Sequence, residues 1–313
     1  MNNKKKFLIG IFIILLISVY IYHTYLRRDK IVIIPRNATA KDVGKILKNE
    51  KLIPSEGLFR WMVFFLFAER NIKHGTYKFR FSLTTIPIVI RLVRGPQLVK
   101  VTIPEGFRVE QIAERLHAKG IILDPIYFIT FVKSNSYNGY LFPETYYFSL
   151  NEDVDYVVNR MVSEFYRKYS EDLRKRAYEL KLTTHQVVVL ASIVEKEAKT
   201  KEEKRLVSAV FHNRLKKGWY LESCATVRYA LKKFTGPLTY KDLNIDSKFN
   251  TYKYYGLPPE PICNPGLDSI EAVLYPAETD DMFFFTENNQ THVFSKYYKQ
   301  HIERQKKSKY SVR

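Results

Sequence analysis

The sequence lacks the motifs of several common kinds of enzyme chemistry. It contains no His-Glu-x-x-His, Cys-x-x-Cys or Gly-x-Ser-x-Gly pattern and no glycine-rich phosphate loop. Seven histidines are scattered without the spacing of metal ligands, so we expect packing or hydrogen-bonding roles for His212, His292 and His301. We therefore expect no metal and no cofactor. Only 12 Gly and 13 Pro among 313 residues also exclude a collagen-like or low-complexity chain.

Acidic residues are too few to balance the basic ones, since 32 Asp and Glu face 51 Lys and Arg, a formal charge of +19. The surplus is +5 in residues 1–30 and +6 in residues 296–313, which leaves +8 elsewhere. A nucleic-acid-binding protein needs a basic patch on its folded core, so we expect no nucleic acid as partner. An anionic membrane or polymer fits better. The length favours two or more domains, and 46% hydrophobic with 15% aromatic residues excludes a disordered chain.

Residues 7–26 form a long, uncharged and mainly apolar run behind a tail with three lysines. At about 1.5 Å per residue, a helix over this run reaches the roughly 30 Å that a bilayer requires. Its far end has the tyrosines of an aromatic belt. A cleaved signal peptide is the alternative, but a small-residue cleavage site is missing. We expect residues 1–6 to be a cytoplasmic tail, residues 7–26 a single transmembrane helix, and the remainder to lie outside.

An internal repeat relates residues 32–53 to residues 101–122. In each copy, a β-rich run and a proline precede an amphipathic helix with apolar residues four positions apart. Thr39 is a plausible N-cap of the first helix. Because two copies are too few for a solenoid, they indicate a small α+β module over residues 30–123. This module serves either as a spacer or as a contact to glycan.

Two further strands are expected between the copies. Residues 75–79 and the apolar run 88–93 have the composition of strands, and Gly95-Pro96 closes the second. After residue 124 an aromatic run gives way to an amphipathic helix over residues 154–169 and a charged, solvated helix over residues 171–182.

The most informative helix is capped by Thr183 or Thr184, is almost entirely apolar over residues 187–194, and carries Glu195 and Glu197 in its last turn. Burial raises the pKa of a carboxyl group at such a place, as a catalytic acid requires. The alternative is that both acids only solvate the helix end, and composition alone favours it. Carboxylates two residues apart point about 200° apart, so they cannot face each other as an acid and nucleophile pair.

Several segments together resemble the endolytic murein transglycosylase family, the YceG-like group. They are NGYLFPETYYF (138–148), ASIVEKEA (191–198), SAVFHNRLKKGWYLESCATVRYAL (208–231), FNTYKYYGLPPEPICNPGLDSIEAVLYPA (249–277) and MFFFTENNQTHVFS (282–295). The resemblance implies an α+β fold with a single N-terminal transmembrane helix. It also implies a small LysM-like α+β module at residues 30–123 and a mixed α/β YceG-like catalytic domain at residues 124–313.

The resemblance implies a lytic transglycosylase, a carbon–oxygen lyase anchored in the bacterial cytoplasmic (inner) membrane. Such an enzyme cleaves MurNAc–GlcNAc β-1,4 bonds within peptidoglycan glycan strands, leaves 1,6-anhydro-MurNAc ends, and acts on nascent strands to terminate elongation. A single Glu first donates and then accepts a proton; the match places it at Glu195, braced by Glu197. Further supporting or substrate-binding positions are implied at Asn213, Arg214, Thr226, Tyr229, Asn250, Thr251 and Tyr252. The implied partners are glycan strands, the lipid bilayer, and penicillin-binding proteins or other peptidoglycan synthases.

The chain departs from the family pattern in residues 221–227, where LESCATV replaces the usual Leu-Gln-Ser-Asp-Pro-Thr-Val. The roles of the missing Gln and Asp are therefore in doubt here, as is that of a Gly replaced by Glu260. Cys224 and Cys263 fall in segments that border one groove in the family. We expect them to form a disulfide in an oxidising compartment, with two free thiols as the alternative.

Two other functions remain open. A non-catalytic, membrane-anchored glycan-binding scaffold would need no desolvated Glu. A hydrolytic glycosidase would need a second carboxylate about 5–10 Å from the first, for which Glu144 and Glu222 are candidates. The ends of digested strands distinguish the three: anhydro ends, ordinary reducing ends, or no new ends.

Overall fold

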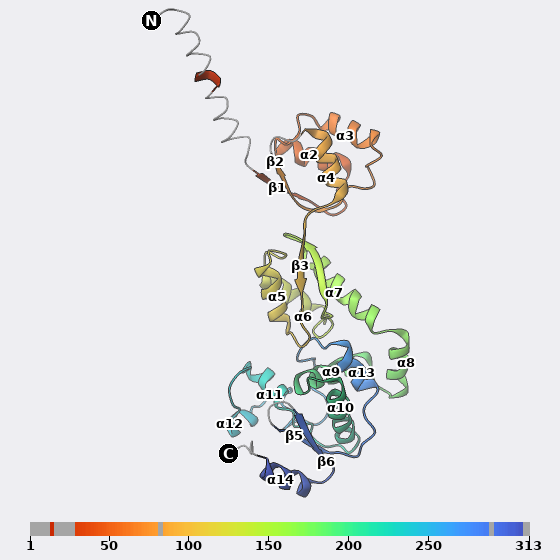
Figure 1. Cartoon of the computed structure of the whole chain (residues 1–313), viewed down its shortest axis with the longest axis vertical. Coiled ribbons are helices and arrows are strands. Elements are labelled where there is room, and N and C mark those ends of the chain that lie inside the picture. The colour runs from red at the N-terminus through yellow and green to blue at the C-terminus, as the bar shows by residue number, and fades with distance from the viewer. Residues whose placement is uncertain (1–12, 16–28, 81–83, 288–290, 309–313) are drawn as a thin grey trace, which may run out of the picture. The chain divides into compact units, whose positions relative to one another are not determined.

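The computed structural model describes residues 13–15, 29–80, 84–287 and 291–308. Over these ranges the chain is a mixed α+β protein, mainly helical, with three two-stranded sheets (Figure 1). Apart from residues 13–15, the predicted transmembrane segment at residues 7–26 lies outside the described residues. Within the described ranges, none of the helices combines the length and the apolar character that crossing a bilayer demands.

The chain divides into two compact units near residue 100, and not at the predicted boundary of residues 123 and 124. Among the described residues, the first unit contains those up to residue 100 together with residues 119–123 and 147–152, and the second unit contains the others. The two copies of the repeat do not form one module, because the helix of the second copy packs in the second unit against the helix that follows it. Both copies nevertheless keep the predicted strand and helix.

The first unit contains an antiparallel pair, β1 (Asp29–Ile34) and β2 (Gly75–Arg80), in which Asp29 lies opposite Arg80 and Ile34 opposite Gly75. Three helices complete it: α2 (Ala40–Asn49), α3 (Glu56–Phe65) and α4 (Thr85–Arg94). The apolar faces of these elements form one core, whose members include Val43, Leu47, Phe59, Tyr77, Phe79 and Leu92. As predicted, Thr39 caps α2, in a reciprocal capping box with Asp42.

One strand prediction in this unit is wrong. The run over residues 88–93 belongs to helix α4, which ends at Gly95 with a φ of 100°. Ile88, Val89 and Leu92 are buried, whereas Ile90 is exposed, so the burial follows a helical and not a strand period. The strand predicted at residues 75–79 is confirmed as β2.

The second unit holds most of the remaining elements. Its helices are α5 (Val109–Ala118), α6 (Pro125–Ser134), α7 (Val154–Lys168), α8 (Glu171–Glu179), α9 (Thr184–Glu197), α10 (Lys201–Lys216), α11 (Cys224–Leu231), α12 (Tyr240–Leu243), α13 (Leu267–Leu274) and α14 (Tyr298–Lys307). Strands β3 (Leu98–Thr102) and β4 (Thr145–Ser149) pair with each other. In the antiparallel pair β5 (Phe283–Glu287) and β6 (Thr291–Ser295), Phe283 lies opposite Ser295. The helices predicted at residues 154–169 and 171–182 are confirmed as α7 and α8.

Helix α9 is the centre of the second unit and packs against α10 and α13 (Figure 1). Thr183 caps it in a box with Gln186, and every residue from Val187 to Val194 is buried, as the sequence predicts. The helix ends at Glu197, because Ala198 takes an extended conformation. This packing fixes the position of the last turn, which carries the two glutamates.

Candidate active site

Glu195 and Glu197 leave the last turn of α9 on different sides and contact different parts of the unit. Glu195 contacts residues of α10 and α13, and Glu197 contacts the residue before α11. This divergence is the one expected for residues two positions apart on a helix. The two carboxyl groups therefore have separate environments, which decide what each can do.

Glu195 belongs to a buried ion pair. Its Oε2 accepts hydrogen bonds from Nζ of Lys204 at 3.1 Å, from the backbone N–H of Gly266 at 3.1 Å and from Oγ of Ser269 at 2.5 Å. The side chains of Lys204 and Glu195 are only 4% and 8% exposed. Gly266 is the N-cap of α13, so the positive end of that helix also faces the carboxylate. Three donors on one oxygen, one of them at a helix N-terminus, are typical of a structural anchor.

Glu105 extends this ion pair. Its Oε2 lies 3.7 Å from Nζ of Lys204, so one ammonium group serves two carboxylates. The pKa of Glu105 is raised, first by burial and then by the negative charge of Glu195. A Cβ atom at Gly266 would collide with the carboxyl group of Glu105, so the bare backbone there makes room for this side chain. The cluster ties the segment after β3 to α9, α10 and α13.

Glu197 has a different environment. It is partly exposed, and Oγ of Ser223 donates a hydrogen bond to its Oε1. Burial raises the pKa of Glu197, and the hydrogen bonds from Ser223 and the backbone of Ala225 offset this only in part. Throughout the described ranges, no basic side-chain nitrogen comes within 4.0 Å of this carboxyl group. Glu197 is thus a carboxyl group with a raised pKa and no close cationic side chain among the described residues.

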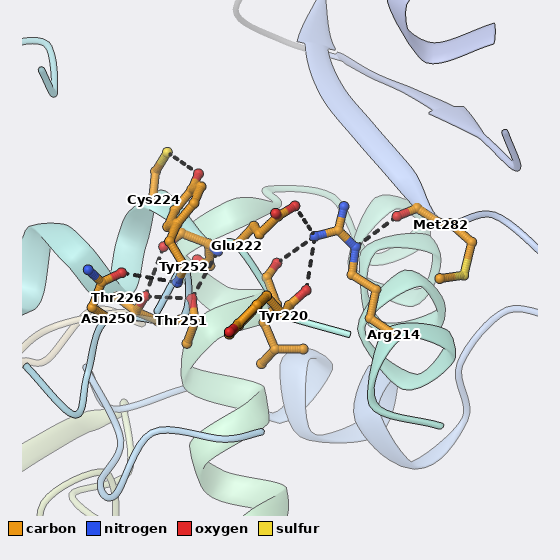
Figure 2. Close-up of polar contacts among 11 residues, drawn as sticks. Arg214, Tyr220, Glu222, Cys224, Thr226, Asn250, Thr251, Tyr252 and Met282 are labelled. Atoms are coloured by element: carbon orange, nitrogen blue, oxygen red, sulfur yellow. Dashed lines mark hydrogen bonds and ion pairs between the residues drawn. The ribbon is translucent and has the colours of Figure 1, made fainter. Parts of the chain in front are cut away.

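Ser223 is held in place by two threonines. Its backbone N–H donates to Oγ1 of Thr251 at 3.0 Å, and its carbonyl accepts from Oγ1 of Thr226 at 2.8 Å. The two threonine hydroxyls are 2.9 Å apart, and both side chains are buried (Figure 2). The predicted site residues Thr226 and Thr251 therefore lie beside Glu197 and act through Ser223.

Tyr252 borders the same carboxyl group. Its hydroxyl lies 3.1 Å from Sγ of Cys224 (Figure 2). The pKa of Tyr252 is raised, chiefly by burial, and the charges of Glu197 and Glu222 add to this effect. Tyr252 is therefore a neutral hydroxyl at physiological pH, able to donate a hydrogen bond beside Glu197.

The sequence over residues 32–307 matches the YceG-like family. The chain belongs to the YceG-like family. It is 31% identical over 304 residues to a Bacillus subtilis (strain 168) protein named endolytic murein transglycosylase, with 88% of this chain and 83% of that one covered. It is 25% identical over 310 residues to a Streptococcus pneumoniae (serotype 2, strain D39) protein of the same name, covering 83% of this chain and 55% of the longer relative.

A solved structure supports the membership. The crystal structure of a yceG-like protein from Listeria monocytogenes has a TM-score of 0.58 and 31% identity to this chain, and the match covers 88% of this chain and 98% of the other. The segments that suggested the family contain both glutamates and the residues around Glu197, namely Ser223, Thr226, Thr251 and Tyr252.

Two of the site positions predicted from the YceG-like resemblance have backbone partners instead of lying beside Glu195. Asn213 donates to the carbonyls of Thr279 and Asp281, at 2.8 and 3.0 Å. Asn250 donates to the carbonyls of Leu243 and Ile245 and accepts from the N–H of Tyr252. These amides shape the loops that carry the family motifs.

Arg214 is buried and has both backbone partners and a charged partner. It donates to the carbonyls of Tyr220, Leu221 and Met282, and its Nη1 lies 2.9 Å from Oε2 of Glu222 (Figure 2). Its guanidinium group therefore fixes the segment leading to Ser223.

Tyr229 lies farther along α11, where its hydroxyl accepts from Asn138 at 3.4 Å and its ring packs on Phe249. It lines a hollow of about 540 Å³ together with Arg108, Lys133 and Phe234. Neither glutamate of the α9 end lines this hollow.

The predicted disulfide is absent, because Cys224 and Cys263 are both free thiols. Cys263 is buried and donates to the carbonyl of Ser192, with Glu195 among its charged neighbours. Cys224 is exposed and lies with Tyr252 near Glu197. Cys263 therefore lies on the Glu195 side of the α9 end, and Cys224 lies on the Glu197 side.

Ser223, Lys204 and Ser269 were not predicted from the sequence. Ser223 had a detectable signal, since a serine directly before a helix is a typical N-cap, and it caps α11 here. Lys204 and Ser269 had none, because only the packing of α10 and α13 brings them to Glu195. In the described ranges, no group of three or more His, Cys, Asp and Glu side chains has the arrangement of a metal site.

Proposed function

We propose that this chain is an endolytic murein transglycosylase, which cleaves MurNAc–GlcNAc β-1,4 bonds within peptidoglycan strands and leaves 1,6-anhydro-MurNAc ends. Its membership in the YceG-like family and the names of its Bacillus and Streptococcus relatives support this function. The observation that carries the proposal is the environment of Glu197, which accepts a hydrogen bond from the Ser223 hydroxyl, has no close cationic side chain among the described residues, and has a raised pKa.

The catalytic residue in this proposal is Glu197 and not Glu195, the residue expected from the sequence. A general acid must hold a proton at working pH and must reach its substrate. Glu195 and Glu197 are both half-buried residues, but the hydrogen-bond donors to Glu197, the Ser223 hydroxyl and the Ala225 backbone, are uncharged. Glu195 directs its Oε2 at three internal donors, including a buried ammonium group. The role of Glu195 is then to hold the last turn of α9.

The reaction needs only this one carboxyl group. Glu197 donates its proton to the glycosidic oxygen as the bond between that oxygen and C1 of MurNAc breaks. The C6 hydroxyl of the same MurNAc attacks C1, and its proton passes to the Glu197 carboxylate. The glycosidic bond is replaced by a C1–O6 bond, no water is consumed, and the acid is regenerated. Ser223 orients the carboxyl group. The neutral Tyr252 hydroxyl is the candidate donor to a sugar oxygen.

Hydrolysis is the second candidate, because one of the predicted second carboxylates lies near Glu197. Glu222 directly precedes Ser223, and its charge acts on the Tyr252 hydroxyl together with that of Glu197. Glu144 instead pairs with Lys168 at 3.5 Å. If Glu222 activated water, the products would have ordinary reducing ends.

Mass spectrometry of digested glycan strands tests the proposal. We expect anhydro ends with the wild-type protein and a loss of at least about 100-fold in rate with Glu197→Gln. Glu195→Gln should lower the unfolding temperature but retain much of the activity below that temperature. A folded but inactive Glu195→Gln, together with an active Glu197→Gln, would reverse the assignment. Ordinary reducing ends would favour hydrolysis.

We further propose that residues 7–26 anchor the chain in the bacterial cytoplasmic membrane, with the tail inside and the catalytic domain outside, where synthases extend new strands. The apolar run and the three lysines before it support this topology. The first unit, which has its own hydrophobic core, would be the LysM-like module that contacts glycan. Deletion of residues 1–26 should release the protein from membranes and leave cleavage in solution intact. A mature protein that begins near residue 28 would instead show that the apolar run is a cleaved signal peptide.

A further inference from the structure

A hollow of about 270 Å³ lies in the second unit beside the segment that precedes Ser223. Five aromatic residues and one acidic residue line it: Trp219, Tyr220, Tyr255, Phe283, Tyr298 and Glu222. Its volume is slightly below the range of about 300–1,000 Å³ that is usual for small-molecule sites. It therefore suits one small ring and not a large cofactor.

The aromatic rings of this hollow are unusually exposed. Trp219 is 43% exposed, Tyr255 65% and Tyr298 64%. The rings also support one another: Tyr220 and Tyr255 stack with centroids 3.8 Å apart, and Phe283 contacts both Trp219 and Tyr298. Contiguous exposed apolar surface of this kind marks a binding site. Because the rings brace each other, little side-chain entropy is lost when a ligand stacks on them.

The polar group of the hollow is fixed in place as well. Glu222 is 48% exposed and pairs through Oε2 with Arg214, whose side chain is only 7% exposed (Figure 2). Its Oε1 accepts no hydrogen bond from a described residue. A carboxylate oxygen held in this way accepts hydrogen bonds from hydroxyl or amide N–H groups.

The hollow is also connected to the proposed catalytic residue. Glu222 lines it, and the next residue, Ser223, donates to Glu197, so the Cα atoms of Glu222 and Ser223 are about 3.8 Å apart. Thr251 fixes both residues, because its carbonyl accepts from the N–H of Glu222 and its hydroxyl from the N–H of Ser223.

We propose that this hollow, the aromatic subsite, binds one pyranose ring of the glycan strand close to the bond that Glu197 cleaves. The C–H faces of a pyranose stack on exposed aromatic rings, and its hydroxyl and N-acetyl N–H groups donate to Glu222. This inference rests on the proposed function, since it identifies the ligand as the same strand. It makes the chain bind its substrate beyond the two sugars of the scissile bond, as cutting within a strand requires.

Tryptophan fluorescence tests the subsite directly, because the chain has only two tryptophans and Trp61 lies in the other unit. The full-length Trp61→Phe, Glu197→Gln protein, in detergent, is titrated with peptide-free glycan strands. We expect a saturable change in the emission of Trp219. In the Glu197→Gln background, Trp219→Ala and Tyr255→Ala should weaken strand binding about 3- to 10-fold. Trp219→Phe should restore part of the binding.

Tyr178→Ala is the matched control, since Tyr178 is an exposed aromatic residue on α8 outside the hollow. It should bind strands like the parent, and all variants should unfold at the same temperature. Unchanged Trp219 emission, or equal binding by Trp219→Ala, Tyr255→Ala and Tyr178→Ala, would overturn the subsite. The reaction is measured separately: normal Trp219 binding with no new strand ends from the Trp61→Phe protein supports the subsite and refutes the proposed function.

Discussion

Nζ of Lys204 lies 3.1 Å from Oε2 of Glu195, and neither side chain is more than 8% exposed. This pair joins α10 to the last turn of α9, two residues before the end of the helix at Glu197. Removing one partner of a buried pair leaves an uncompensated charge, which costs far more than losing a pair at the surface.

Lys204→Met should therefore lower the free energy of unfolding by about 3–5 kcal/mol, as measured by urea denaturation. Lys201→Met is the control on the same helix, because Lys201 is half exposed and pairs with Asp268 and Glu271 at the surface. Its cost should stay below about 1 kcal/mol. Similar losses in both variants would contradict a buried anchor at Glu195.

Ser223→Ala should shift the pH dependence of cleavage. The Ser223 hydroxyl lowers the pKa of Glu197, so its removal raises that pKa further. Because the first step needs a protonated Glu197, kcat/KM falls as the pH rises through this pKa. The falling limb should therefore move to higher pH in the variant.

Ser170→Ala controls for the loss of a helix cap, because Ser223 and Ser170 are both N-cap serines that accept from the helix backbone. Each variant should lose about 1 kcal/mol of stability, but only Ser223→Ala should move the limb. An unchanged pH profile in Ser223→Ala would show that the Ser223 hydroxyl does not affect the pKa of the catalytic acid.

Glu197→Gln should gain stability relative to the wild type as the pH rises. A raised folded pKa means that the folded state binds the Glu197 proton more tightly than the unfolded state does. The wild type therefore loses stability as the pH increases from the ordinary value of about 4.5 up through the raised pKa, and Gln has no such dependence. Urea denaturation at pH 4 and pH 7 gives the free energy of unfolding of both proteins. The advantage of Glu197→Gln over the wild type should be larger at pH 7 than at pH 4. If this advantage were smaller at pH 7, the fold would stabilise the charged form of the Glu197 carboxyl group.

Gly139→Ala should be strongly destabilising, because Gly139 has a φ of 85° and a Cβ there would lie 2.5 Å from the ring of Pro261. Gly236 has a similar φ of 74°, but a Cβ there would meet no atom within 4 Å, so Gly236→Ala isolates the backbone effect. We expect a cost of about 1–2 kcal/mol for Gly236→Ala and roughly 1–3 kcal/mol more for Gly139→Ala, as measured by thermal unfolding. Equal costs would show that the Pro261 turn moves aside.

The two thiols should differ in when they are alkylated, one in the folded protein and the other only after unfolding. Cys224 is an exposed residue whose Sγ lies against the Tyr252 hydroxyl, and the partial desolvation of the thiol raises its pKa. Cys224 should therefore be alkylated in the folded protein, but slowly at pH 7. Cys263 should react only after unfolding. Mass spectrometry after alkylation without reductant should find two modified cysteines in the unfolded protein. A single disulfide-linked species would restore the disulfide expected from the sequence.

The sequence was sufficient for the helices whose apolar residues repeat regularly, such as α7 and α9, and for the cap at Thr39. It failed at residues 88–93, where a short β-branched run has no pattern that separates a buried strand from a helix. It also identified both glutamates but not their roles. The spacing excludes a facing pair, but only the contacts made by Lys204, Ser269 and Ser223 distinguish an anchor from an acid, and these residues come from separate segments.

The sharing of one helical turn by Glu195 and Glu197 also limits how the sequence can diverge. A change at Lys204 or Ser269 alters the anchor of Glu195, and through the rigid turn it alters the aim of Glu197 as well. Substitutions at Glu195, Lys204 and Ser269 should therefore be tolerated together more often than singly. Among homologues, these three positions should therefore be replaced together while Glu197 is retained.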